Sequence, residues 1–314
     1  MYSIGVDLGG TNIAVGLVTE AGEILYKDSC PTGVGRPYEE ILRDMGQLIL
    51  RVIEHEGKTP ADIDFIGVGS PGVSDPETGE IVFANNLYWH HVPVRGELQR
   101  YIDKPVYINN DANVAALAEF KAGACRGVRN SVTITLGTGV GSGLIINGQL
   151  YAGSHNVGAE LGHMIIDLDG IQCNCCNKGC FERYTAATAL IREGRRVMFD
   201  FPDSLIGQKA GRLENISAKT VIDSAREGDF FALDIFKKYV HTLAMGIINL
   251  INLLDPDIIA IGGGVAAAGD FLLEPLRAEV AEHIYFKDLP YARIVPAQLG
   301  NDAGIVGAAM LGRI

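Results

Sequence analysis

The sequence is poor in several features that would assign a protein to particular roles. Its 314 residues include one tryptophan, and its longest apolar candidate, 243–254, is interrupted by Asn249 and Asn252 and is too short to span a bilayer. The chain start lacks the basic and apolar regions of a secretion signal. The 26 basic residues form no block and are outnumbered by 38 acidic residues, giving a net charge of −12. We therefore expect a cytoplasmic protein whose main partner is neither nucleic acid nor a membrane, although backbone N–H groups can still hold a small anion.

The length and the order of the expected elements point to the α/β class. A chain of 314 residues exceeds what one core usually fills, and a hydrophobic fraction of 47% suffices for two cores. Apolar patterning predicts strands at 2–7, 13–18 and 23–30, a helix at 38–55 and a strand at 63–68. This βββαβ order predicts an α/β domain with a mixed sheet.

A second cycle of the same plan begins at residue 131. A strand at 131–135, a glycine-threonine turn and a strand at 144–147 repeat the first hairpin, which indicates an internal duplication. The expected later elements are helices at 185–199, 217–227 and 230–254, a strand at 257–261, a helix at 271–283, and a helix at 303–311 packed back onto the first domain. We expect a small N-terminal domain of 1–111 plus 301–314 and a large C-terminal domain of 112–300.

Four of the six cysteines lie between Glu160 and Glu182. Cys173, Cys175 and Cys180 are close enough in sequence to converge with His163 on one ion, and tetrahedral zinc takes such sulfur and imidazole ligands. A disulfide cluster or buried apolar thiols are the alternatives, but disulfides suit secreted chains. The pattern favours structural zinc, with one thiol left over.

Two glycine-rich turns, 8–12 and 136–143, each join two expected strands. Glycine lets backbone amides approach a phosphate closely, although an ordinary tight turn fits equally well. Asp7 and Thr11 beside the first turn favour a site for phosphate or hydrated Mg²⁺. Two similar motifs are rejected, because no helix follows the dinucleotide-like 67–72 and the P-loop-like 57–59 lacks the required earlier glycine.

Polar residues also follow several expected strands. Asp111 lies where a strand gives way to a helix, the usual place for ligands in α/β folds. The N-cap of that helix is a strong competing role, and the two roles need not exclude each other. Asn86 and Trp89 lie in a stretch that suits a sugar or an ordinary surface loop. The glycines at 262–264 could accept the flat face of a nucleotide or simply allow tight packing.

Together these features indicate phosphoryl transfer. Two glycine-threonine hairpins without a Walker lysine suggest a nucleotide held by backbone amides and Mg²⁺ between two similar domains. Asp111 is then the candidate general base for a hydroxyl nucleophile, since phosphoryl transfer depends mainly on positioning, metal and charge stabilisation.

The motifs, in this order, resemble those of the ROK sugar kinases. The matching stretches are Asp7-Leu8-Gly9-Gly10-Thr11-Asn12, Asn110-Asp111-Ala112-Asn113, Leu136-Gly137-Thr138-Gly139-Val140-Gly141, Glu160-Leu161-Gly162-His163 and the cysteine run to Glu182. The resemblance covers nearly the whole chain. It implies an actin-like ATPase (ribonuclease H-like) fold, with a sugar bound in the cleft between two similar domains.

The resemblance also implies roles for individual residues. It makes Asp111 the catalytic base. It implies sugar contacts by Asn86, Asn110, Glu160, His163 and Glu182. It places the ATP phosphates near Asp7, Gly9, Gly10, Thr11, Asn12, Thr138 and Gly139, and the adenosine near Gly263 and Gly264. It implies structural zinc held by His163, Cys173, Cys175 and Cys180, so that His163 binds zinc through one ring nitrogen and sugar through the other.

One residue departs from the family pattern. Cys176 stands where the family usually has glycine, and a left-handed backbone at this position would strain a cysteine. Cys176 also competes with Cys175 as a possible ligand.

Within the family, the element 86–89 and the absence of a helix-turn-helix before Asp7 resemble the bacterial glucokinases. We expect ATP-dependent phosphorylation of the 6-hydroxyl of glucose by a homo-oligomer. A kinase for N-acetylmannosamine, fructose or another hexose, a sugar-sensing protein without turnover, and a redox protein built on the thiols are the alternatives. Polyphosphate is the alternative to ATP as donor.

Overall fold

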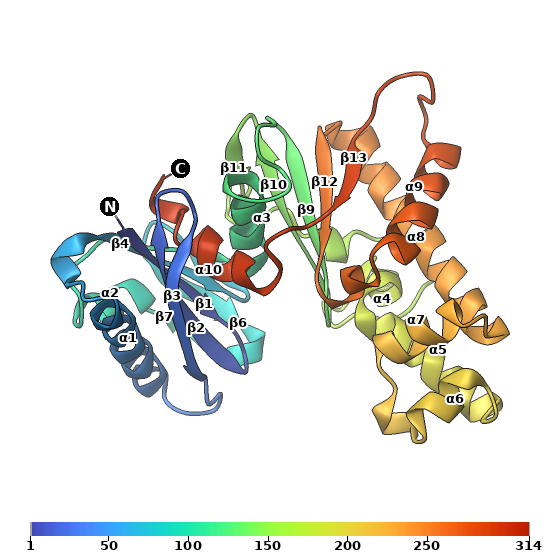
Figure 1. Ribbon diagram of the computed structural model, residues 1–314, viewed down its shortest axis with the longest axis horizontal. Coiled ribbons are helices and arrows are strands. Elements are labelled where there is room, and N and C mark those ends of the chain that lie inside the picture. The colour runs from blue at the N-terminus through green and yellow to red at the C-terminus, as the bar shows by residue number, and fades with distance from the viewer. Residues whose placement is uncertain (1, 314) are drawn as a thin grey trace. The chain divides into compact units, whose positions relative to one another are not determined.

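The computed structural model describes residues 2–313 (Figure 1). The chain divides into two compact units, one of Met1–Thr133, Gly143–Ala159 and Ala297–Ile314 and one of Ile134–Ser142 and Glu160–Pro296. The domain boundaries expected from the sequence stay a prediction. Within the described range, no helix is long and apolar enough to cross a membrane.

The first unit is built on a mixed five-stranded sheet. Its strands, in the order β3-β2-β1-β4-β8, are β1 (Tyr2–Leu8), β2 (Asn12–Thr19), β3 (Ile24–Pro31), β4 (Ile63–Ser70) and β8 (Val106–Asn110). The pairs β1–β2 and β2–β3 are antiparallel, whereas β1–β4 and β4–β8 are parallel. With α1 at Tyr38–His55, the expected βββαβ order and mixed sheet are confirmed.

Different helices cover the two faces of this sheet, and successive residues of β1 point to opposite faces. On one face, the fully buried Ile4, Val6 and Leu8 belong to the same hydrophobic core as residues of α1. On the other face, Ser3 donates a hydrogen bond to the Ala309 carbonyl (2.7 Å), and a Cβ at Gly5 would lie 1.9 Å from the Ile305 carbonyl oxygen. Small residues of β1 thus allow α10 (Ala303–Ala308) to pack closely on this face. The expected return of the last helix to the first sheet is confirmed (Figure 1).

The remaining elements of the first unit surround this sheet. A small antiparallel sheet contains β5 (Val73–Asp75), β6 (Glu80–Ala84) and β7 (Trp89–Val92), and the helices are α2 (Val94–Gln99) and α3 (Asp111–Lys121). The stretch 67–72 runs from β4 toward β5 and opens no helix, which agrees with rejecting the dinucleotide motif.

A second five-stranded sheet has the order β11-β10-β9-β12-β13. Its strands are β9 (Ser131–Leu136), β10 (Val140–Ile146), β11 (Gln149–Tyr151), β12 (Ile258–Gly262) and β13 (Arg293–Pro296). In both sheets, three consecutive strands are followed on one edge by two later strands. This shared order is what the repeated strand–turn–strand pattern predicts.

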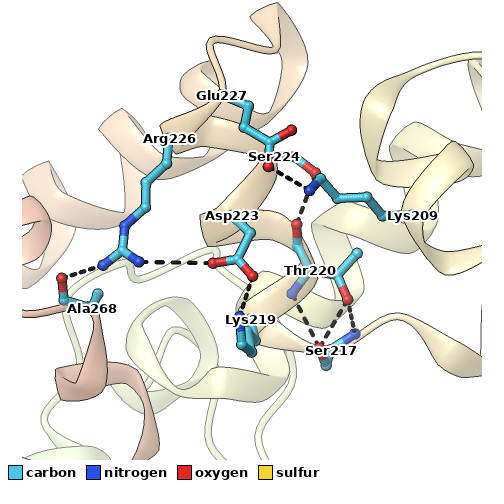
Figure 2. A network of polar contacts seen from close by, with 9 residues as sticks. All are labelled: Lys209, Ser217, Lys219, Thr220, Asp223, Ser224, Arg226, Glu227 and Ala268. Carbon is cyan, nitrogen blue, oxygen red and sulfur yellow. Dashed lines mark hydrogen bonds and ion pairs between the residues drawn. The ribbon is translucent and has the colours of Figure 1, made fainter.

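The second unit is mainly helical. Its helices are α4 (Glu182–Thr185), α5 (Ala187–Asp200), α6 (Leu205–Ala210), α7 (Ala218–Arg226), α8 (Phe230–Leu254) and α9 (Asp270–His283). The bounds of α8 match the prediction. Its start is fixed by Asp229, which caps the helix by accepting a hydrogen bond from the Ala232 N–H (2.8 Å). Figure 2 shows that polar contacts hold α7 in place, with Lys209 of α6 pairing with Glu227 at the end of α7.

Candidate active site and metal centre

In the first unit, the candidate residues lie at the carboxyl-terminal edge of the main sheet. The parallel strands β1, β4 and β8 end together, with Asp7 paired to Gly69 and Ser70 paired to Asn110. The sheet therefore brings Asp7 and Asn110, with the adjoining Asp111, to one edge, where α/β folds commonly bind ligands.

Asn110, and not Asp111, caps α3. Its Oδ1 accepts from the backbone N–H groups of Ala112 (2.9 Å) and Asn113 (3.4 Å), and its Nδ2 donates to the Gly72 carbonyl (3.0 Å). The cap role considered for Asp111 is therefore wrong. Asp111 is the first residue of the helix, exposed to solvent, and its Oδ1 accepts from the Ala112 N–H (2.8 Å). A carboxylate in this first turn is favoured by the helix dipole.

The first glycine-rich turn joins β1 to β2. The Gly9 N–H donates to the Asn12 carbonyl (2.9 Å), and residues 10–12 are exposed. Asn86 lies beside this turn, because a Cβ at Gly10 would come 3.8 Å from the Cβ of Asn86. Asp7, near the end of β1, is half-buried beside Gly304, and this burial raises its pKa.

The second glycine-rich turn, in the second unit, is fastened to the start of α5. The Ala187 N–H donates to the Gly137 carbonyl (2.8 Å), and the Thr188 hydroxyl donates to the Thr138 carbonyl (3.0 Å). Glu182 reaches the same turn, since a Cβ at Gly139 would lie 2.8 Å from its Oε2. A glycine at 139 therefore leaves room for the Glu182 carboxylate.

Glu160 and His163 lie near Glu182. The short turn Leu161–His163 is held by the Leu161 N–H, which donates to the Ser142 hydroxyl (3.1 Å). Burial raises the pKa of Glu160; the nearby His163 lowers it, and the Glu182 carboxylate raises it further. Three of the expected sugar contacts thus share one neighbourhood.

The segment from 164 to 181 folds back on itself. Ile165 pairs antiparallel with Cys180, and the Phe181 N–H donates to the Met164 carbonyl (2.8 Å). The Phe181 ring is fully buried against α8, where a Cβ at Gly246 would come 2.3 Å from it. Gly246 therefore provides the space that fixes this segment on the long helix.

Four ligand atoms converge at the base of this segment. One imidazole nitrogen of His163 and the sulfurs of Cys173, Cys175 and Cys180 all lie within 4.8 Å of one another. Cys175 and Cys180 have their sulfurs 3.5 Å apart, and the Cys173 sulfur lies 3.9 Å from the His163 Nδ1. Tetrahedral zinc with Zn–S bonds of about 2.3 Å places sulfurs roughly 3.8 Å apart, so the donors fit this ion.

The thiols of this group have different proton affinities. The Asn177 N–H lowers the pKa of the Cys175 thiol to about 7, whereas burial raises the pKa of Cys180 to about 12. A bound metal requires thiolates and therefore has to displace the Cys180 proton. Zinc itself stays a prediction.

Cys176 has the left-handed backbone that its place in the sequence predicts. Its φ is 73°, its side chain is exposed, and its N–H donates to the Cys173 carbonyl (3.1 Å). It does not belong to the group of four converging ligands. The structure thus favours Cys175 over Cys176 as the ligand.

The glycines after β12 differ in what they require. Gly263 has a φ of 83°, and a Cβ there would lie 2.6 Å from the backbone of Leu136, whereas a Cβ at Gly264 would meet open space. The turn Gly264–Ala268 that follows is tied to α7, because Arg226 donates to the Ala268 carbonyl (Figure 2).

Comparison with known proteins gives matches that extend over nearly the whole chain. The model of the ROK family matches residues 3–313. The chain belongs to the ROK family. It is 40% identical over 309 residues to a glucokinase from Thermotoga maritima, covering 98% of this chain and 96% of that protein. It is also 30% identical to a putative xylose repressor from Caldicellulosiruptor, covering 98% of this chain and 77% of the repressor.

A solved structure is similar to this chain over its full length. A ROK glucokinase from Streptomyces griseus, in complex with glucose and AMPPNP, matches with a TM-score of 0.84 and 34% identity, covering 100% of this chain and 99% of that one. The expected actin-like ATPase fold is confirmed by this likeness to a ROK sugar kinase.

Sequence reasoning missed residues that hold the two turns of this ROK protein. Thr32 and Thr188 each donate a side-chain hydrogen bond to a turn carbonyl, Gly9 (2.7 Å) and Thr138 (3.0 Å). Neither threonine belongs to a motif, and both are separated from their partners in sequence. Only the folded chain identifies them.

Proposed function

We propose that this chain is an ATP-dependent sugar kinase that phosphorylates the 6-hydroxyl of glucose. The observation that carries the proposal is 40% identity to a glucokinase across 98% of the chain. The structure supports it locally, because both glycine-rich turns and the strand-end aspartate are present with the expected local geometry. A cytoplasmic, homo-oligomeric enzyme is part of the proposal.

In this reaction, Asp111 accepts the proton of the sugar hydroxyl while the oxygen forms a bond to the γ-phosphorus of ATP. The bond from that phosphorus to the bridging oxygen breaks, and ADP leaves. Mg²⁺, when bound, would neutralise charge on the phosphates, and Asp7 and Thr11 are the residues proposed to hold it in hydrated form. The exposed position of Asp111 at the start of α3 suits a base that must meet a substrate.

The phosphates are assigned to the two turns. Their proposed contacts are Asp7, Gly9, Gly10, Thr11, Asn12, Thr138 and Gly139. Gly263 and Gly264 are proposed for the adenosine, and the open space at Gly264 supports this. Backbone N–H groups in such turns attract anions without a lysine, which is consistent with an acidic chain.

The sugar is assigned to Asn86 and Asn110 of the first unit and to Glu160, His163 and Glu182 of the second. The Asn110 amide uses one N–H on the Gly72 carbonyl, and its second N–H is proposed to meet a sugar hydroxyl. The His163 Nδ1 faces Cys173, so the opposite Nε2 is the nitrogen proposed for sugar.

The metal in this proposal is structural. His163, Cys173, Cys175 and Cys180 would hold zinc, which would fix the orientation and tautomer of the His163 ring. The ion would take no part in phosphoryl transfer, because all four of its positions are filled by protein.

A panel of acceptors and donors tests the proposal. ADP formation is measured with glucose, N-acetylmannosamine and fructose, using ATP or polyphosphate as donor. We expect glucose with ATP to give the highest kcat/KM. A clear preference for another hexose, or for polyphosphate, would contradict the assignment of that substrate.

A second candidate is a sugar-sensing protein without turnover, which the 30% identity to a putative xylose repressor favours. Calorimetry separates the two. Sugar binding without ADP formation for every sugar in the panel would support the sensor, whereas turnover excludes it.

A further inference from the structure

Thr32 lies directly after β3 and donates two hydrogen bonds to the first glycine-rich turn. Its side chain is fully buried. Its hydroxyl donates to the Gly9 carbonyl (2.7 Å), and its backbone N–H donates to the Thr11 carbonyl (2.9 Å). Two of the peptide groups in the turn are therefore anchored by one residue.

Anchoring these carbonyls also directs the amides of the turn. In a trans peptide the C=O and the N–H of one plane point in opposite directions. With the Gly9 carbonyl aimed at Thr32, the Gly10 N–H points away from it; the Thr11 carbonyl fixes the Asn12 N–H in the same way. Gly10 and Asn12 are both exposed. The two N–H groups thus point away from Thr32 and belong to residues that an anion in solvent can approach.

Thr32 is in turn held by an arginine. The Nη2 of Arg36 donates to the Thr32 carbonyl (3.0 Å), and its Nη1 donates to Asp44 on α1 (2.8 Å). Gly33 makes room for this side chain, because a Cβ there would lie 2.6 Å from the Arg36 Nε. Asp44, Arg36 and Thr32 form a chain of contacts from α1 to the turn.

We infer that Thr32 is a positioning residue for ATP, which acts by orienting the Gly10 and Asn12 N–H groups toward the nucleotide phosphates. The inference rests on the proposed function, in which this turn binds phosphate. It assigns Arg36 a supporting role, since the guanidinium restrains the peptide between Thr32 and Gly33 and so the position of Thr32. No contact of Thr32 with the substrate is required.

The test compares two variants that each lose one buried hydroxyl bond. Thr32→Val removes the donor to Gly9 while keeping the shape of the side chain. Ser3→Ala is the matched control, because the Ser3 hydroxyl is also buried and also donates over 2.7 Å to a carbonyl, that of Ala309, at the opposite end of β1. Both variants are expected to unfold at a lower temperature than the parent.

Only Thr32→Val is expected to change nucleotide binding. We expect its KM for ATP and its Kd for AMPPNP to rise about tenfold, the effect of one lost interaction of ordinary strength, while the KM for glucose stays within about twofold. Thr32→Ser should restore the parental values. An unchanged Kd for AMPPNP in folded Thr32→Val, or an equal rise in Ser3→Ala, would overturn the inference.

Two further measurements keep the result decisive. If Thr32→Val does not fold, Arg36→Gln replaces it, with an expected rise of about threefold in the Kd for AMPPNP; an unchanged value would overturn the inference. Calorimetry with AMPPNP does not depend on turnover. An inactive parent that binds AMPPNP normally would therefore refute the proposed reaction and leave this inference to be decided by Kd.

Discussion

Replacing Cys176 by glycine should stabilise the protein without loss of its metal. Cys176 has a φ of 73° and an exposed side chain, so glycine removes backbone strain and sacrifices no buried contact. A left-handed backbone costs a non-glycine residue about 1–2 kcal/mol. Glycine costs about 0.5–1 kcal/mol in chain entropy, which leaves a net gain of roughly 0.5–1 kcal/mol. For a chain of this size the gain corresponds to a rise in Tm of roughly 1–3 °C.

The assay combines thermal unfolding with elemental analysis of reduced, metal-replete protein. We expect one zinc per chain in both the parent and Cys176→Gly. Gly179→Ala is the contrasting control, because Gly179 has a φ of 69° and a Cβ there would lie 1.6 Å from the Asp167 carbonyl oxygen. That variant should be strongly destabilised. Loss of zinc in Cys176→Gly would refute the reasoning, since Cys176 would then be a ligand.

Three further predictions concern charge, metal and packing. Burial raises the pKa of Asp7, so the free energy of unfolding falls as the carboxyl ionises and the pH rises through that pKa. The Asp7→Asn variant should therefore have a higher Tm than the parent at pH 7 and nearly the same Tm below pH 4. Its kcat/KM should be roughly 10²-fold lower. Cys180→Ser should give less than one zinc per chain and raise the KM for glucose more than the KM for ATP, as measured by elemental analysis and kinetics, because zinc holds His163. Glu119 is buried and accepts from the N–H groups of Ala124, Gln298 and Leu299, so Glu119→Ala should cost about 3 kcal/mol or more in denaturant unfolding.

Each prediction has a result that would contradict it. An unchanged or lower Tm for Asp7→Asn at pH 7 would show that its charge is not a burden on the fold. Full zinc content in Cys180→Ser would remove this cysteine from the ligand set. An unfolding free energy within about 0.5 kcal/mol of the parent would show that Glu119 is not needed to hold these three N–H groups.

The elements with strong local signals could be predicted from the sequence. The helices at Tyr38–His55 and Phe230–Leu254 have the expected bounds, because their apolar spacing extends over many turns. The small sheet of β5, β6 and β7 could not be predicted in the same way. Strands of three to five residues carry too few alternating positions to distinguish them from loops.

In the candidate site, too, features with a local sequence signal could be predicted and the others could not. The convergence of His163 with three cysteines was accessible from sequence, because ligands of one ion must lie close in space and these lie close in sequence. The cap of α3 was not, since Asn110 and Asp111 are adjacent and both residue types cap helices well. The hydrogen bond from Thr32 to Gly9 joins residues 23 positions apart and depends on the pairing of β2 with β3. No local pattern in the sequence contains it.

The most direct test of the central claim is the rate of ATP-dependent glucose 6-phosphate formation by the parent and by Asp111→Asn. Asparagine keeps the size of the side chain but cannot accept the hydroxyl proton. We expect the parent to form this product and the variant to lose about 10² to 10⁴ in kcat, while its KM values stay close to those of the parent. No product from the parent, or a variant rate within a few-fold of the parental rate, would contradict the account.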